Sequence, residues 1–385
     1  MGSDHLLAGT LKRRPVNQRM GFDQFLGNPR IVTALRSMLR GGRVPNAILF
    51  TGPRGSGKFT LARMFAQAAN CERLADDFCG ECKTCARIAL LADPWPLIEQ
   101  GLAQRGESAD SAMVERMPLL VEPHPDVWGI FPDPVRLRNP VAHPMIRVGQ
   151  LRAIQRAAYF TPEAKRRVFI LDGADSMRRT DADIFLKVLE EPPDTATLIL
   201  TATRVDSLRP TIRSRCLQFH FAPVEADQIE ALLEQQTALK PQQRKLAARL
   251  AGGSPGLALE LDLEESGRLR REALRLIELS IGAERYRELF AATALLSKQE
   301  KESFENVLDL FYSLFTDLLE LAYNSKSTAL RNPDLRGELL ALSKKIDLKW
   351  ITQAAADLDR LESRLRRNVG RQLGLDAAAV SWGLH

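Results

Sequence analysis

The stretch Ile48–Thr60 constrains the fold of this chain more than any other part of its sequence. It starts with a short apolar run that predicts a buried strand, continues as a glycine-rich loop, and ends in apolar residues at helical spacing. The loop glycines and the lysine that closes the loop are Gly52, Gly55, Gly57 and Lys58. A strand, a glycine loop, a lysine and a helix in this order predict a phosphate-binding loop, because backbone N–H groups and a helix N-terminus then converge on phosphate oxygens. The alternative is a glycine turn without function.

The residues that would hold a metal ion beside this loop depart from the usual pattern. A serine or threonine hydroxyl normally follows the lysine and binds Mg²⁺, but here the residue is Phe59. Thr60 lies about 100° further round a helix, so we expect its hydroxyl to point elsewhere. Asp172 follows a second apolar run, and a carboxylate at such a strand end can hold Mg²⁺, although it can also simply end the strand. Gly173 stands where many ATPases carry a glutamate that polarises the attacking water.

Four of the five cysteines form a cluster directly after the helix that follows the loop. They are Cys71, Cys79, Cys82 and Cys85. Four thiolates so close together in sequence are typical of a structural zinc site with no open coordination position. The alternative is that each is buried separately as a small apolar residue, but the segment Cys79–Cys85 is rich in Gly, Lys and Glu and reads poorly as core. Cys216 lies far away in sequence.

Apolar runs and helical patterns alternate up to about residue 222 and then give way to helical patterns alone. The runs at 48–50, 168–171, 197–201 and 217–221 predict a largely parallel sheet that is covered on both faces. Residues 93–147 are rich in proline and are expected to be irregular, with a mobile stretch at 99–118. The predicted parts are a flexible leader (1–20), an α/β phosphate-loop domain (21–222) with a cysteine insert (71–85), a small helical domain (223–264) and a C-terminal all-α bundle (265–385).

Composition narrows the setting in which this chain works. The net charge of +6 and the pI of about 9.1 suit an acidic partner such as nucleic acid, although many other proteins share them. Candidate phosphate contacts are Arg152, Arg156, Lys165, Arg166 and Arg167, with a merely solvated surface as the alternative. No apolar run is long enough to cross a bilayer, and the first residues lack the apolar core of a signal peptide. We therefore expect a reduced, cytoplasmic location without a membrane partner.

Several motifs occur together and carry a family resemblance. They are GNPRIVTALRSMLRGGRVPNAILFTGPRGSGK (27–58), the four-cysteine insert, HPD (124–126), VFILDGAD (168–175), FLKVLEEPP (185–193), RPTIRSRC (209–216), GGSPGLAL (252–259) and NVGRQLGLD (368–376). With these motifs the chain resembles the delta-prime subunits of bacterial DNA polymerase III clamp loaders, within the AAA+ ATPases. The resemblance implies an AAA+ core, a small helical lid and a C-terminal helical collar.

The resemblance also implies partners and a catalytic role. Subunits of this kind assemble with motor subunits of the gamma/tau type and with a delta-type subunit in a hetero-pentameric ring. The ring loads a sliding clamp onto primed DNA during replication, and ATP with Mg²⁺ lies between neighbouring subunits. By this resemblance Arg215 is an arginine finger that acts in trans on a neighbour's ATP. The alternative is an ordinary surface arginine, since Arg209 and Arg213 lie beside it.

Three positions depart from an active ATPase of this family. They are Phe59, Gly173 and Leu257, where the motor subunits carry a magnesium ligand, a catalytic carboxylate and a second phosphate-contacting arginine. These departures favour a subunit that hydrolyses little or no ATP itself, and they leave nucleotide binding by its own degenerate loop open. One alternative is an active motor subunit, which would need the missing hydroxyl and carboxylate. Another is a zinc-containing DNA-binding regulator, which would need a recognition module that the sequence does not show.

Overall fold

The computed structural model describes residues 21–106, 108–138, 144–178, 180–282, 286–298, 301–365 and 370–383. The predicted leader at 1–20 lies outside the described residues. The chain divides into two compact units. The first unit comprises the described residues up to Gln228 together with Gly253–Leu257, and the second comprises Ile229–Gly252 and the described residues from Ala258 onward. The domain boundaries expected from the sequence stay predictions.

A six-stranded sheet forms the centre of the first unit, in the order β2-β3-β4-β5-β1-β6. The strands are β1 (Ala47–Thr51), β2 (Val121–His124), β3 (Val127–Ile130), β4 (Arg167–Leu171), β5 (Ala196–Ala202) and β6 (Leu217–His220). All neighbouring strands pair in parallel except β2 and β3, which are antiparallel. The prediction of a largely parallel sheet is therefore confirmed, and the four predicted strands correspond to β1, β4, β5 and β6.

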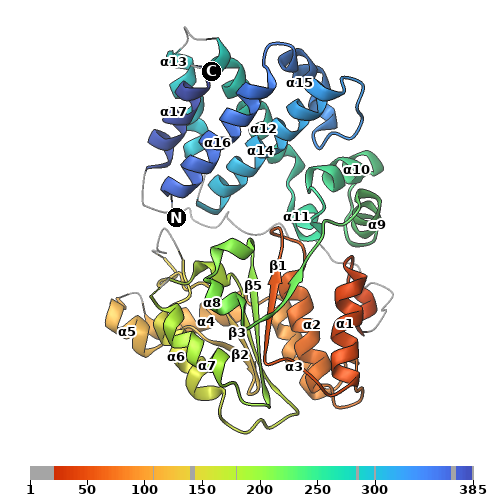
Figure 1. The fold of residues 1–385 in the computed structure, drawn as a ribbon, viewed down its shortest axis with the longest axis vertical. Coiled ribbons are helices and arrows are strands. Elements are labelled where there is room, and N and C mark those ends of the chain that lie inside the picture. The colour runs from red at the N-terminus through yellow and green to blue at the C-terminus, as the bar shows by residue number, and fades with distance from the viewer. Residues whose placement is uncertain are drawn as a thin grey trace, which may run out of the picture. The chain divides into compact units, whose positions relative to one another are not determined.

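Helices cover both faces of this sheet (Figure 1). Alternate residues of β1 show why, because Ile48 and Phe50 pack into one apolar cluster while Ala47 and Leu49 pack into another. The helices on the first side are α1 (Pro29–Arg40), α2 (Lys58–Asn70), α3 (Lys83–Ala89) and α4 (Trp95–Arg105). Those on the second side are α6 (Val148–Ala157) and α7 (Ala182–Glu190). The remaining elements are η1 (Gly21–Gln24), η2 (Leu90–Ala92), α5 (Ser111–Arg116), η3 (Ala174–Ser176), η4 (Val205–Ser207) and α8 (Pro210–Arg213).

The proline-rich stretch 93–147 is more ordered than the sequence predicts. It contains α4, α5, β2 and β3, and α4 and α5 fall largely within the stretch 99–118 that we expected to be mobile. Prolines in a sequence argue against helices and strands, but here they occupy positions that tolerate proline. The proline of α4 lies in its first turn, and Pro123 lies in β2, which is an edge strand of the sheet. Residues 139–143 lie outside the described part.

All the secondary-structure elements described in the second unit are helices, as expected from the sequence. Its helices are α10 (Pro241–Leu250), α12 (Leu263–Ile281), α13 (Tyr286–Ser297), α14 (Lys301–Tyr323), η5 (Pro333–Leu335), α15 (Arg336–Ser343), α16 (Leu348–Leu365) and α17 (Arg371–Trp382). Two more helices, α9 (Ala226–Gln236) and α11 (Pro255–Glu260), run from one unit into the other. Trp350 and Trp382 lie in the core of the bundle, where the indole N–H of Trp350 donates to the carbonyl of Trp382 at 2.7 Å.

Among the described residues, no helix has both the length and the apolar character needed to span a membrane.

Within the second unit, Arg249 of α10 donates to the carbonyl oxygen of Thr328 at 2.6 Å. This bond ties the small helical segment to the bundle.

Candidate functional site

The glycine-rich loop lies between β1 and α2, as the sequence predicts. Gly55 and Gly57 have φ angles of +72° and +88°, which favour glycine over any other residue. Both also lie against neighbouring segments of the first unit. A side chain at Gly55 would meet the backbone nitrogen of Leu257 at 2.7 Å, and one at Gly57 would meet the ring of Phe25 at 2.9 Å. The loop conformation therefore depends on these glycines.

Lys58 is the first residue of α2 and its side chain is buried. Its ammonium group donates to the carbonyl oxygens of Gly52 at 2.8 Å and Pro53 at 2.6 Å, so the lysine closes the loop on itself. Burial lowers the pKa of Lys58, and the charges of Asp172 and Asp175 oppose this shift. A buried cation beside a glycine loop is suited to bind an anion, because an anion would restore the electrostatic stabilisation that burial removes.

Asp172 follows β4 and accepts a hydrogen bond from the hydroxyl of Thr201 at 2.6 Å. Burial of the carboxyl raises the pKa of Asp172, and the Thr201 hydroxyl and the Lys58 charge oppose this shift without reversing it. Thr201 also accepts from the backbone N–H of Gly173 at 3.0 Å. Thr201 was not predicted from the sequence. A polar residue near the carboxyl end of the neighbouring strand β5 was the available signal, since parallel strands end at the same edge of a sheet.

Phe59 and Thr60 lie in the first turn of α2 in two different environments. The ring of Phe59 packs against the ring of Phe131, with 5.2 Å between the centroids, and joins the apolar cluster of the first unit. Thr60 is exposed. Leu257 lies against the loop, where Gly256 donates its N–H to the carbonyl of Gly55 at 2.8 Å. An apolar side chain thus occupies two of the positions where an active ATPase of this family needs a polar one.

Arg215 lies between α8 and β6 and is exposed. Its guanidinium group donates to the carbonyl of Thr211 at 2.9 Å and to the carboxylate of Glu190 at 2.8 Å. Glu190 is the last residue of α7, where a negative charge is unfavourable beside the negative end of the helix dipole, so the arginine offsets that charge. Arg213 instead pairs with Asp206 at 3.0 Å.

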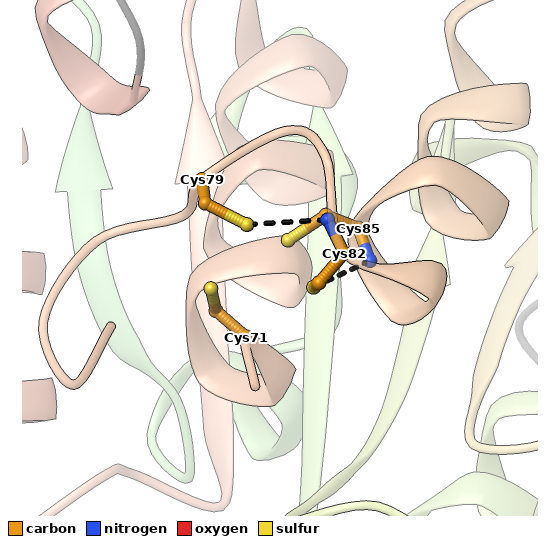
Figure 2. A group of neighbouring side chains, drawn as sticks. All are labelled: Cys71, Cys79, Cys82 and Cys85. Atoms are coloured by element: carbon orange, nitrogen blue, oxygen red, sulfur yellow. Dashed lines mark hydrogen bonds between the residues drawn. The ribbon is translucent and has the colours of Figure 1, made fainter. Parts of the chain in front are cut away.

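The four predicted metal-binding cysteines come together in the structure. Cys71 follows the end of α2, Cys79 lies in the next loop, and Cys82 and Cys85 lie at the start of α3 (Figure 2). All four are buried, and their sulfur atoms lie within 4.8 Å of one another. A zinc ion with four Zn–S bonds of about 2.3 Å can fit among sulfur atoms this close together, so the four cysteines suit a closed tetrahedral site.

Backbone N–H groups point at three of these sulfur atoms. Cys71 accepts from Leu74 at 3.4 Å, Cys79 accepts from Cys82 at 3.3 Å, and Cys82 accepts from Cys85 at 3.4 Å. Burial opposes ionisation of Cys79, but backbone hydrogen bonds lower its pKa to about 7. Such N–H···S contacts stabilise thiolates, which are the form that binds metal.

The loop between Cys71 and Cys79 also holds the start of the described chain. Asp77 accepts from the backbone N–H of Phe22 at 2.9 Å and from the guanidinium of Arg36 at 2.5 Å. Asp76 accepts from Arg40 at 2.6 Å. The cysteine module and the segment η1–α1 are therefore linked by charge-assisted hydrogen bonds.

Two of the five basic residues that we expected to contact phosphates form an ion pair or hydrogen bonds within the fold. Arg167 is buried and pairs with Asp126 at 3.1 Å. Arg166 donates to the hydroxyl of Thr197 at 2.6 Å and to the carbonyl of Ala196 at 3.2 Å. Their guanidinium groups hold the amino ends of the strands together. The expectation of a phosphate contact is wrong for the buried Arg167 and stays a prediction for Arg166, which is half-buried.

Models of two known protein families match parts of this chain. The family model described as DNA polymerase III, delta subunit, matches residues 27–225, which is more than half of the 385 residues. The chain belongs to the DNA polymerase III delta subunit family. A second model, described as the C-terminal part of the DNA polymerase III delta subunit, matches residues 269–382 of this delta-family chain. The predicted clamp-loader subunit with an AAA+ core and a helical C-terminal region is therefore confirmed.

Curated relatives of this delta-family chain include two proteins named as other subunits of the same polymerase. DNA polymerase III subunit tau of Escherichia coli is 30% identical over 62% of the chain and 32% of the relative. DNA polymerase III subunit gamma of Buchnera aphidicola from Acyrthosiphon pisum is 28% identical over 55% of the chain and 48% of the relative. The chain thus spans a third to a half of the length of these relatives.

Two solved structures from Thermotoga maritima are also similar to this chain. A protein related to the DNA polymerase III gamma subunit has a TM-score of 0.39 and 17% identity, covering 92% of this chain and 98% of its own. The RuvB Holliday junction branch migration motor has a TM-score of 0.38 and 15% identity, covering 82% of this chain and 89% of its own.

Proposed function

We propose that this chain is a delta-prime-type clamp-loader subunit that hydrolyses little or no ATP and donates Arg215 to a nucleotide bound by a neighbouring subunit. The exposed guanidinium of Arg215 carries this proposal. Its contact with Glu190 is a surface ion pair, with 35% and 50% of the two side chains exposed. Surface pairs of this kind contribute about 0–1 kcal/mol, so Arg215 can leave Glu190 for a phosphate at little cost.

The residues around the chain's own phosphate loop support the absence of hydrolysis. Phe59 offers no oxygen to a metal ion, and Gly173 offers no carboxylate to a water molecule. Leu257 brings no positive charge to the loop that it packs against. Binding without hydrolysis suits a subunit that completes its neighbour's site rather than its own.

We also propose a structural zinc ion for the chain. Cys71, Cys79, Cys82 and Cys85 would hold it and leave no position open for a substrate. The ion would supply a local cross-link between the end of α2 and the start of α3, without a direct part in catalysis.

The proposed partners follow from family membership. They are gamma/tau-type motor subunits and a delta-type subunit in a hetero-pentameric ring, the sliding clamp and primed DNA, all in the cytoplasm. A competing function is an active motor subunit, because the curated relatives are named tau and gamma. The lack of a hydroxyl at Phe59 and of a carboxylate at Gly173 argues against an active motor subunit.

The deciding experiment compares two arginine variants in the reconstituted complex. Arg215→Ala should leave assembly intact and slow ATP hydrolysis at the one site that it serves by about 10³–10⁵-fold, because a planar cation stabilises the charge on the γ-phosphate in the transition state. DNA-stimulated ATPase and clamp loading should both fall. Arg215→Lys should restore little, since a point charge lacks the guanidinium geometry.

Arg213→Ala is the matched control, because it removes the same charge only two residues away from Arg215. Arg213 itself pairs with Asp206. It should have a much smaller effect on both activities. If an assembled complex with Arg215→Ala hydrolyses ATP and loads clamps like the unmodified complex, Arg215 does not act in trans.

A further inference from the structure

The loop before α2 keeps the parts that bind a phosphate. Gly57 precedes α2 and has no side chain with which to cap it, so the N–H groups of the first turn are left for a ligand. Ser56 is 1% exposed, and within the described part of the chain its hydroxyl oxygen has no hydrogen-bond partner. A buried hydroxyl without a partner beside uncapped N–H groups indicates a polar ligand at this loop.

Lys58 supplies the positive charge at the same place. Its ammonium group contacts only neutral carbonyl oxygens among its hydrogen-bond partners, those of Gly52 and Pro53 in the loop itself. Burial lowers the pKa of Lys58, although the charges of Asp172 and Asp175 oppose this shift. A phosphate group at the loop would provide an anion in direct contact with the ammonium group.

The metal side of the site does not fit Mg²⁺. This ion requires close to ideal octahedral coordination by oxygen atoms. Where a hydroxyl would bind it, Phe59 places a ring that packs against Phe131. The Asp172 carboxylate accepts a hydrogen bond from the Thr201 hydroxyl at 2.6 Å, so one of its oxygens already has a partner. The anion-binding half of the site is thus intact while the metal-binding half is not.

We propose that the loop Gly52–Lys58 binds the phosphates of a nucleoside diphosphate or triphosphate without Mg²⁺. A metal-free polyphosphate carries more negative charge than its magnesium complex, so the lysine and the helix N-terminus attract it more strongly. This site is separate from the role proposed for Arg215, because binding to the lone chain involves no neighbour. A failure of one proposal therefore leaves the other standing.

Isothermal titration calorimetry of the purified full chain tests the proposal with ADP, ATP and inorganic pyrophosphate. Each is titrated with Mg²⁺ present and with Mg²⁺ omitted, without a chelator, since a chelator would also strip metal from the cysteines. At least one nucleotide should bind, with a Kd that stays the same or falls when Mg²⁺ is omitted, because the metal-free polyphosphate carries the larger negative charge. Lys58→Ala should weaken this binding by about tenfold or more.

Two variants at one position provide the matched comparison. Phe59→Thr restores the hydroxyl and should make nucleotide binding about tenfold tighter with Mg²⁺ than without it. Phe59→Val has nearly the same shape as Phe59→Thr without the hydroxyl, and its binding should respond to Mg²⁺ as that of the unmodified chain does. The proposal is overturned if no nucleotide binds, if Mg²⁺ tightens binding to the unmodified chain, or if only pyrophosphate binds.

Discussion

At the residue scale, ion pairs in this chain fall into two kinds with different roles. Arg105 and Asp133 are almost fully buried, with 1% and 0% of their side chains exposed, and two contacts at 2.9 and 2.7 Å join them. Arg213 and Asp206 form a single contact, and 96% of the aspartate side chain is exposed. The buried pair orders the proline-rich stretch between α4 and β4, whereas exposed pairs such as that of Arg215 and Glu190 exchange partners easily.

A first prediction concerns the cost of breaking these pairs. Asp133→Ala should lower the free energy of unfolding by about 3–5 kcal/mol, because it leaves the Arg105 charge buried without a counter-charge. Asp206→Ala should change it by less than about 0.5 kcal/mol. Native-state hydrogen exchange of the β3 and β4 amides measures both changes within the first unit alone. Equal effects of the two variants would contradict the assigned difference.

At the scale of elements, the cysteine module joins three segments. The segments are α2, which Cys71 follows, α3, at whose start Cys82 and Cys85 lie, and the segment η1–α1. Asp77, in the loop between α2 and α3, accepts hydrogen bonds from η1 and α1. The amide of Gln67 in α2 adds a bond of 2.9 Å to the carbonyl of Cys85. Since α2 begins at Lys58, one helix connects the proposed metal site to the phosphate loop.

A second prediction follows for metal removal. The purified chain should contain one zinc ion, and a chelator under reducing conditions should speed hydrogen exchange at residues 71–89 most, because the ligands are local. Exchange at α1 should rise next, through the loss of the Asp77 contacts, while β5 should change little. The measurements are metal analysis and hydrogen exchange by mass spectrometry.

Asp77→Ala separates the metal from the contacts that it supports. This variant should keep its zinc and still show faster exchange at α1, because the bonds to Phe22 and Arg36 are lost. A chain that contains no zinc when purified without chelator would contradict the assignment of the four cysteines.

At the scale of the whole molecule, the chain combines an α/β unit that carries the phosphate loop and Arg215 with a helical unit. The helical unit has its own core, in which Phe311, Phe315 and Trp382 lie within 6.4 Å of one another by ring centroids. A unit with a core of its own can fold independently of the first unit. The function proposed for Arg215 requires a neighbouring subunit, so the lone chain should do little chemistry.

A third prediction tests this at the level of the isolated chain. ATP hydrolysis by the purified chain should equal the background rate, because Phe59 and Gly173 remove the metal ligand and the carboxylate that hydrolysis needs. Lys58→Ala should leave that rate unchanged, as measured by phosphate release. Turnover well above background that Lys58→Ala abolishes would identify an active motor subunit instead.

Patterns in the sequence alone were enough to predict the class of fold and most residues of the candidate site. The spacing of glycines around Lys58, the four cysteines and the strands at β1, β4, β5 and β6 are local patterns, and local patterns record local chemistry. The departures at Phe59 and Gly173 were equally visible, because each is a missing functional group at a known offset from a motif.

Contacts between groups that lie far apart in the sequence could be seen only in the folded chain. Thr201 holds Asp172, Glu190 holds Arg215, and Leu257 covers the loop at Gly55, and each of these contacts depends on how the strands and helices pack. The strands β2 and β3 were also missed, since strands of four residues become stable only when a neighbouring strand pairs with them, here β4 with β3 and β3 with β2. The burial of Arg167 and the internal hydrogen bonds of Arg166 likewise became evident only in three dimensions, because a charge pattern in sequence does not reveal which side chains the fold encloses.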